Sequence, residues 1–75
     1  MNERDAVLLV EARSKSKSGK ARQSREASNL SRGEVAAVVG VQESTVFRWE
    51  AGSRAPRGVP GVRYGRFLRL LEAQQ

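Results

Sequence analysis

One stretch in the middle of the chain carries the start and stop signals of two short helices in immediate succession. Ser31 is followed three residues later by Glu34, the spacing of a capping box in which each side chain bonds the other residue's backbone N–H. Gly40 then ends the first helix, because glycine readily adopts the left-handed conformation at a helix C-terminus. A second helix opens at about Gln42–Glu43, and Gly52 ends it. This spacing predicts two short helices joined by a tight turn.

The apolar residues of this stretch fall at helical spacing. One side of each helix is therefore expected to be buried, as in an amphipathic helix. The predicted core positions are Val35, Ala36, Val38 and Val39 in the first helix, Val41 in the turn, and Val46 and Trp49 in the second helix.

The flanking sequence predicts three further helices. Residues 3–13 are apolar at helical spacing, residues 20–29 form a polar helix that the first must cover, and residues 62–74 are strongly amphipathic. The alternating Ser and Lys of residues 14–20 offer no apolar face, which predicts a flexible linker or arm. Two Pro and two Gly make residues 53–61 an irregular loop.

These elements predict an all-α fold, a compact bundle of four to five short helices that contains a helix-turn-helix. We divide the chain into an N-terminal helix with a basic Ser/Lys linker at residues 1–19 and a helix-turn-helix domain at residues 20–75, with its motif at residues 31–51.

The composition of the chain limits the classes of function that it can have. The chain has 75 residues, no Cys and no His, so thiolate metal sites and the usual general base are absent, and we expect no enzyme, metal or cofactor. The net charge is +6, and six cations without an acid fall in residues 13–25, a pattern that attracts nucleic acid; the plain alternative is a solubilising surface. No apolar run approaches the roughly 20 residues of a membrane span. A cytoplasmic location is expected.

The stretch Leu30–Gly52 resembles the helix-turn-helix of the Cro/C1-type (XRE) DNA-binding family, which has a lambda-repressor-like fold. The positions that match the family pattern are Val35-Ala36, Gly40-Val41, Ser44-Thr45-Val46, Trp49-Glu50, Gly52 and Pro56. The resemblance implies that double-stranded DNA is the partner and that the second helix enters the major groove. It also implies structural roles for Ala36, Gly40, Val46 and Trp49, and a buried ion pair between Arg25 and Glu50.

The same resemblance gives the residues that would read bases: Gln42, Glu43, Ser44, Phe47 and Arg48. Arg48 suits guanine and Gln42 suits adenine, whereas Ser44 suits a base or a phosphate. Phe47 faces outward by register, where it would contact a thymine methyl group; the alternative is that it belongs to the core. Glu43 either accepts from cytosine or interacts with the helix dipole.

Backbone phosphates would be held by a second set of residues. Ser31 and Arg32 match the family's contact positions, although the family usually has Gln in place of Arg32. The complete predicted set is Ser31, Arg32, Thr45, Arg54 and Arg57, with Lys15, Lys17 and Lys20 from the arm. The alternative for each cation is a solvated surface charge.

The leading hypothesis is a small Cro-like transcription regulator of a phage or mobile element that binds DNA as a monomer or a homodimer, with no small-molecule ligand and no membrane. Leu70, the exposed side of residues 62–74 and the apolar residues 6–10 are candidate dimer surfaces. The alternatives are a recombination directionality or architectural DNA-binding protein and an antitoxin-like module that binds another protein.

Overall fold

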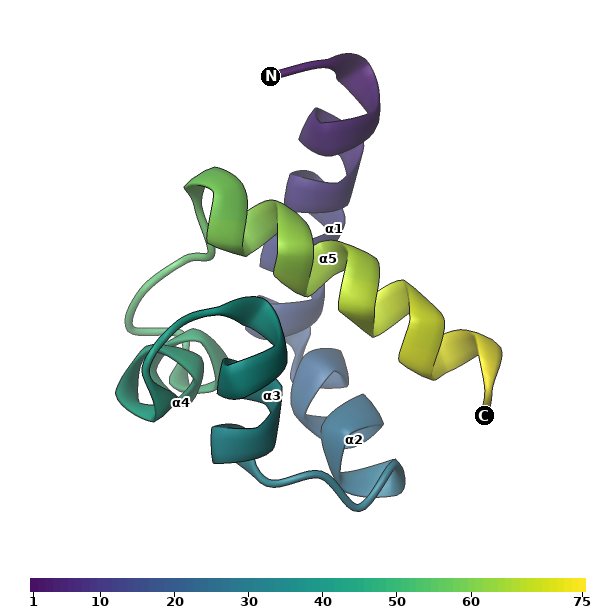
Figure 1. Ribbon diagram of the computed structural model, residues 1–75, viewed down its shortest axis with the longest axis vertical. Helices are drawn as coiled ribbons and strands as arrows, with labels where there is room; N and C mark the ends of the chain where they lie inside the picture. Colours follow the sequence, from purple (N-terminus) through teal and green to yellow (C-terminus); the bar gives the residue numbers. More distant parts are fainter.

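Five α-helices joined by short connections make up the computed structural model, which describes every residue from Met1 to Gln75 (Figure 1). The helices are α1 (Glu3–Ser18), α2 (Lys20–Ala27), α3 (Arg32–Val39), α4 (Glu43–Ala51) and α5 (Gly58–Ala73). The predicted all-α class is confirmed. None of the helices combines the length and the apolar composition that crossing a bilayer requires.

The first helix is longer than the sequence predicted. It begins after Asn2, whose side chain accepts the N–H of Asp5 at 2.8 Å, and it ends at Gly19, which has a φ of +86°. The expected linker at residues 14–20 is therefore wrong, because helix α1 continues to Ser18 and α2 follows directly.

A buried serine explains why the Ser/Lys stretch is helical. Ser16 is only 5% exposed and continues the inward stripe that Leu8 and Ala12 begin, at intervals of four residues. A helix face packed closely against its neighbours needs small side chains there, and Ser16 meets that need without being apolar. Counting apolar residues alone therefore missed this part of the helix.

The local signals of the helix-turn-helix are confirmed. Ser31 Oγ accepts the N–H of Glu34 at 3.0 Å, and the N–H of Ser31 donates to Glu34 Oε1 at 2.8 Å. That backbone bond from Ser31 holds the pKa of Glu34 below its usual range. Gly40 has a φ of +86° and its N–H donates to the carbonyl of Ala36 at 2.8 Å.

One predicted core position is wrong. Val38 is 60% exposed, because the buried face of α3 consists of Val35, Ala36 and Val39, and Val38 lies outside it.

The last helix begins earlier than expected. Helix α5 starts at Gly58, within the predicted loop, and includes Pro60 in its first turn. Proline is tolerated there because the N–H groups of a first turn have no partner within the helix. The Pro- and Gly-rich composition therefore marks the start of a helix, and the irregular loop is confined to residues 52–57.

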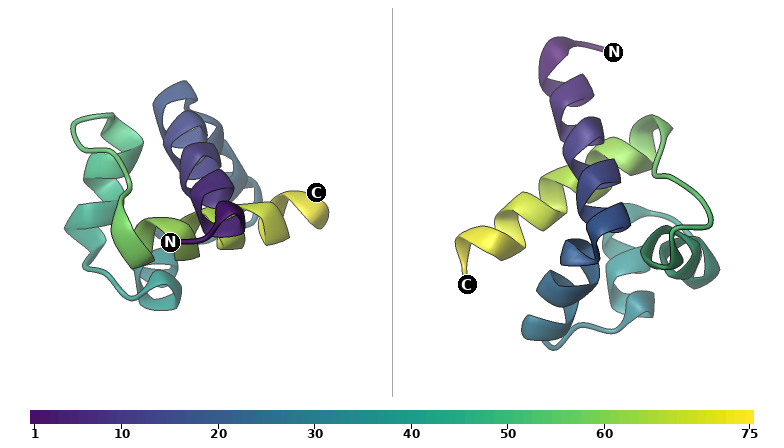
Figure 2. Two further views of the ribbon diagram at one scale, coloured as in Figure 1. Left: turned by 90° about the horizontal axis from the view of Figure 1, so that it is seen from above. Right: turned by 180° about the vertical axis from the view of Figure 1, so that it is seen from behind.

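Helices α1 and α5 cross closely, as seen from the front in Figure 1 and from behind in Figure 2. The crossing depends on two glycines of α5. A Cβ atom at Gly65 would collide with the backbone of Leu8, and one at Gly61 would lie 2.7 Å from Leu9 Cδ1. Glycine is needed at these positions because of the close approach of the neighbouring helix.

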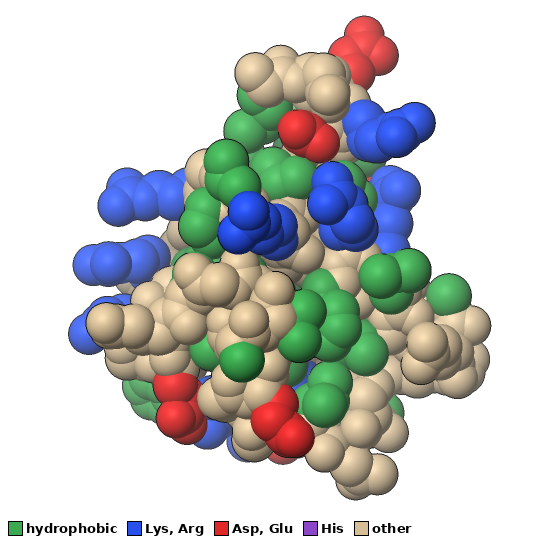
Figure 3. All heavy atoms as spheres, viewed as in Figure 1, with side chains coloured by type: hydrophobic (Ala, Val, Ile, Leu, Met, Phe, Trp, Pro, Cys, Tyr) green, Lys and Arg blue, Asp and Glu red, His purple; other side chains and the backbone are tan.

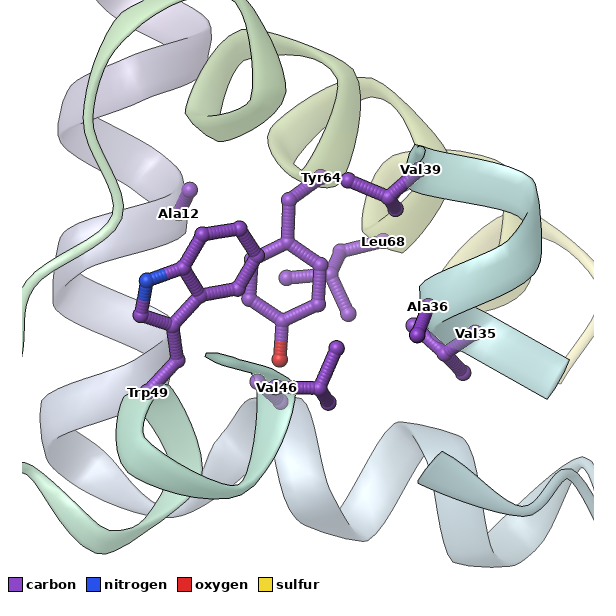
Figure 4. Close-up of a cluster of buried hydrophobic side chains, with 9 residues drawn as sticks. Ala12, Val35, Ala36, Val39, Val46, Trp49, Tyr64 and Leu68 are labelled. Carbon is purple, nitrogen blue, oxygen red and sulfur yellow. The ribbon is translucent and has the colours of Figure 1, made fainter. Parts of the chain in front are cut away.

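Side chains from all five helices meet in one core (Figure 4). Trp49 and Tyr64 form its centre, with ring centroids 4.7 Å apart and ring planes inclined by 34°. The core consists of Ala12, Ala21, Val35, Ala36, Val39, Val46, Trp49, Tyr64 and Leu68. A smaller cluster of Leu8, Leu9 and Val62 extends the contact between α1 and α5. Helix α1 is thus part of the folded bundle.

Candidate nucleic-acid interface

Helix α4 is buried on one side and exposed on the other. Val46 and Trp49 are 0% and 3% exposed, as expected for the anchoring residues. The opposite side presents Ser44, Phe47 and Arg48, which are all exposed and follow the i, i+3, i+4 spacing of one helix face. Phe47 is 53% exposed, so of its two interpretations the structure supports the outward one.

The start of α4 presents two further predicted residues. Gln42 is the N-cap residue, but its side chain makes no capping hydrogen bond and is exposed. Glu43 is exposed and lies near the start of α3, with Oε2 3.5 Å from the position that a Cβ atom would occupy at Gly33. Its carboxylate therefore lies near the N-terminal ends of two helices, where helix dipoles favour a negative charge.

These residues border a shallow surface hollow of about 420 Å³. It is lined by Arg32, Glu43, Ser44 and Phe47, and thus combines a cation, an anion, a hydroxyl group and an aromatic ring. The edge of a base pair presents hydrogen-bond donors, acceptors and, in thymine, a methyl group, all of which such a lining could contact.

A buried carboxylate holds α4 against the rest of the helix-turn-helix. Glu50, whose side chain is 3% exposed, accepts from Arg25 Nε at 2.6 Å and from Arg25 Nη2 at 3.0 Å. Arg25 also donates to the carbonyl of Leu30 at 2.9 Å. The hydrogen bond to Glu50 raises the pKa of Arg25 further, so the guanidinium stays charged. The predicted ion pair between Arg25 and Glu50 is confirmed.

Arg32 joins this network, which the sequence did not reveal. Its Nε donates to Glu50 Oε1 at 3.1 Å, and its guanidinium carbon lies 5.2 Å from the centre of the Phe47 ring. Arg32 therefore supports the outward position of Phe47 by a cation–π contact. Its side chain is 31% exposed, so part of the guanidinium remains accessible from outside. The only signal in the sequence was the replacement of the family's usual Gln.

Four of the predicted backbone-contact cations are exposed and unpaired. Arg54 and Arg57 follow α4, and Lys17 and Lys20 lie near the α1–α2 junction; all four are exposed and free of ion pairs. Figure 3 shows Lys and Arg side chains along the left edge of the molecule, the side on which Figure 1 places α4 and the following segment.

Three other predicted contact residues are less accessible or already bonded. Thr45 is half-buried, beside a small hollow of about 150 Å³. Ser31 is exposed, but its hydroxyl oxygen caps α3. The Lys15 side chain extends from α1 toward α5, and its Nζ lies 2.8 Å from Glu72 Oε2 and 3.6 Å from Glu11 Oε1. Only 13% of this side chain is exposed. Unlike Lys17, Lys15 is thus engaged in joining two helices.

A protein-family model described as helix-turn-helix matches residues 22–58 of the chain. Residues 22–58 are a helix-turn-helix domain of the Cro/C1 (XRE) type. No curated protein and no solved structure matches the chain.

The matched region of this helix-turn-helix domain runs from the first turn of α2 to the start of α5. It contains every predicted base-reading residue and the Arg25–Glu50 ion pair. Helix α1 lies outside it, although α1 contributes Ala12 to the common core. The family is one of DNA-binding domains, so the exposed face of α4 is the candidate surface for DNA.

Proposed function

We propose that this chain is a sequence-specific regulator of transcription that binds double-stranded DNA with α4 in the major groove. The observation that carries the proposal is the division of α4 into a buried side and an exposed side, within a domain of the Cro/C1 type. In helix-turn-helix proteins the outward residues near the start of the second helix contact base edges.

Each outward side chain has a chemical role in this proposal. Arg48 donates two hydrogen bonds to the O6 and N7 acceptors of guanine, and Gln42 forms hydrogen bonds with adenine. Phe47, supported by Arg32, contacts the methyl group of thymine. Ser44 donates to a base or a phosphate.

The charges around α4 position the protein on the backbone. Arg54 and Arg57 lie directly after α4 and are exposed, which suits contacts with the phosphates that border the groove. The exposed part of Arg32 and the hydroxyl group of Ser31 lie at the start of α3, where backbone N–H groups also favour an anion.

In this proposal the protein regulates transcription by occupying its operator. A protein of this kind represses transcription by covering its operator, and a dimer would span two half-sites about 34 Å apart. Val38 and Leu70 are 60% and 57% exposed and border one hollow of about 270 Å³ with Phe67, which makes this the favoured surface for a second copy.

The test is selection of binding sites from a random-sequence duplex library, followed by fluorescence anisotropy at several salt concentrations. We expect a defined site, for which Arg48→Ala lowers affinity by about 1–3 kcal/mol and relaxes one base position. Arg4→Ala, which removes an exposed cation from the first turn of α1, is the matched control and should leave specificity unchanged.

The selected sequences also distinguish the modes of action. An inverted repeat supports a dimeric regulator, and Leu70→Glu should then abolish the dimer in sedimentation experiments. Direct repeats would instead support a recombination or architectural protein. Equal loss of affinity for specific and random DNA in Arg48→Ala would contradict base reading by Arg48.

A further inference from the structure

A pocket of about 300 Å³ lies between the second half of α1 and the segment that follows α4. It is distinct from the hollow on the reading face, and one of its sides is formed by the second half of α1, which lies outside the matched family region. The residues that matter for its chemistry are Arg13, Ser16, Lys17, Trp49, Arg54 and Pro56.

All the charged residues that line this pocket are cations. Arg13, Lys17 and Arg54 border it, no Asp or Glu does, and none of the three forms an ion pair. Arg13 is held in place because its Nε donates to the carbonyl of Pro56 at 2.8 Å. Its terminal nitrogens remain available for a ligand. Three uncompensated cations around one pocket favour an anion.

A neutral donor reinforces this preference. Trp49 is 3% exposed, and the nitrogen-bearing edge of its indole ring points toward α1 (Figure 4). An indole N–H only donates, so it suits an anion or another acceptor.

We propose that this pocket binds a phosphate group, held by Arg13, Lys17 and Arg54 with the indole N–H of Trp49. The phosphate comes either from the DNA backbone beside the groove that α4 occupies or from a free phosphate compound. The DNA form of the proposal rests on the proposed function, whereas the phosphate site itself does not. Arginine and lysine are the usual side chains for this ligand because they supply charge together with several N–H donors.

Trp49 provides a local probe because it is the only tryptophan of the chain. Its indole N–H gives a single NMR resonance, which can be followed while inorganic phosphate replaces chloride at constant ionic strength. We expect a saturable shift, with an affinity about tenfold weaker in Lys17→Gln and in Arg54→Gln. Both residues are exposed, so neither substitution should prevent folding. Arg4→Gln, about 20 Å along α1 from Lys17 at 1.5 Å per residue, should bind phosphate as the wild type does.

A random-sequence DNA duplex identifies the source of the phosphate. If the pocket takes a backbone phosphate, the duplex shifts the same resonance, and Lys17→Gln lowers the slope of log affinity against log salt by about 0.9. Arg4→Gln should leave that slope unchanged. A response to inorganic phosphate alone supports the site and assigns it to a free phosphate compound.

The proposal is overturned if neither ligand shifts the indole resonance, or if Arg4→Gln weakens phosphate binding as much as Lys17→Gln. If the protein binds DNA but neither DNA nor inorganic phosphate shifts the indole resonance, the pocket is refuted and the proposed function stands. A response to phosphate in a protein that binds no DNA would refute the proposed function and leave the pocket standing.

Discussion

Replacing Glu50 by alanine should cost this protein a large part of its stability. The Glu50 side chain is 3% exposed and accepts three hydrogen bonds, two from Arg25 and one from Arg32. Without it, Arg25, whose side chain is 10% exposed, retains only the carbonyl of Leu30 as an acceptor. Removing one partner of a buried ion pair costs about 3–5 kcal/mol.

That loss is large against the stability available. At about 0.05–0.15 kcal/mol per residue, a chain of this length has a free energy of unfolding of roughly 4–11 kcal/mol. Glu50→Ala should therefore remove between about a quarter and all of it. Arg32→Ala should cost only about 1 kcal/mol, because its side chain is 31% exposed and makes a single bond to Glu50.

Urea denaturation followed by circular dichroism measures both effects, provided that the denaturant slope stays constant among the variants. The double variant Arg25→Met/Glu50→Leu should recover much of the loss, because apolar residues can replace a buried ion pair without leaving a charge. A cost below about 1 kcal/mol for Glu50→Ala, the value of a surface pair, would refute the reasoning. Equal costs for Glu50→Ala and Arg32→Ala would refute it as well.

Three further predictions concern other parts of the molecule. Gly65→Ala should lower the free energy of unfolding by about 1–3 kcal/mol, because its Cβ atom would collide with the backbone of Leu8, whereas Gly33→Ala meets only ordinary contacts and should not destabilise. Burial, with a contribution from the charge of Glu50, raises the pKa of Tyr64 to about 12 from 10.0. Stability should therefore be intact below pH 10 and fall by up to about 2.7 kcal/mol as the pH rises to 12, a loss that Tyr64→Phe should abolish in alkaline unfolding experiments. Phe47→Ala should change stability by no more than about 0.5 kcal/mol, since the ring is 53% exposed, yet lower the ratio of specific to random DNA affinity in anisotropy titrations; an unchanged ratio would exclude base reading by Phe47.

The sequence predicted most of the helix-turn-helix because its signals are local. A capping box joins residues three apart, and a glycine at a helix end acts within one turn, so Ser31, Glu34 and Gly40 could be interpreted without knowing the rest of the fold. The outward position of Phe47 followed from the same register, once Val46 and Trp49 had been assigned to the core.

The errors occurred where a partner helix decides the outcome. Residues 14–18 looked like a linker because nothing in their own sequence shows that Ser16 would be buried. Val38 fits an apolar stripe, yet no other helix covers it, and it is 60% exposed.

The sequence by itself therefore determined where helices α3 and α4 begin and end, and which side of α4 faces outward, because these depend on hydrogen bonds and periodicity within a few residues. Only the tertiary structure decided that Arg32 reaches Glu50 and Phe47, that Lys15 is paired with Glu72, and that Arg13, Lys17 and Arg54 surround one pocket. These contacts join residues far apart in the chain, and the close crossing of α1 and α5 at Gly61 and Gly65 shapes the bundle in which they form.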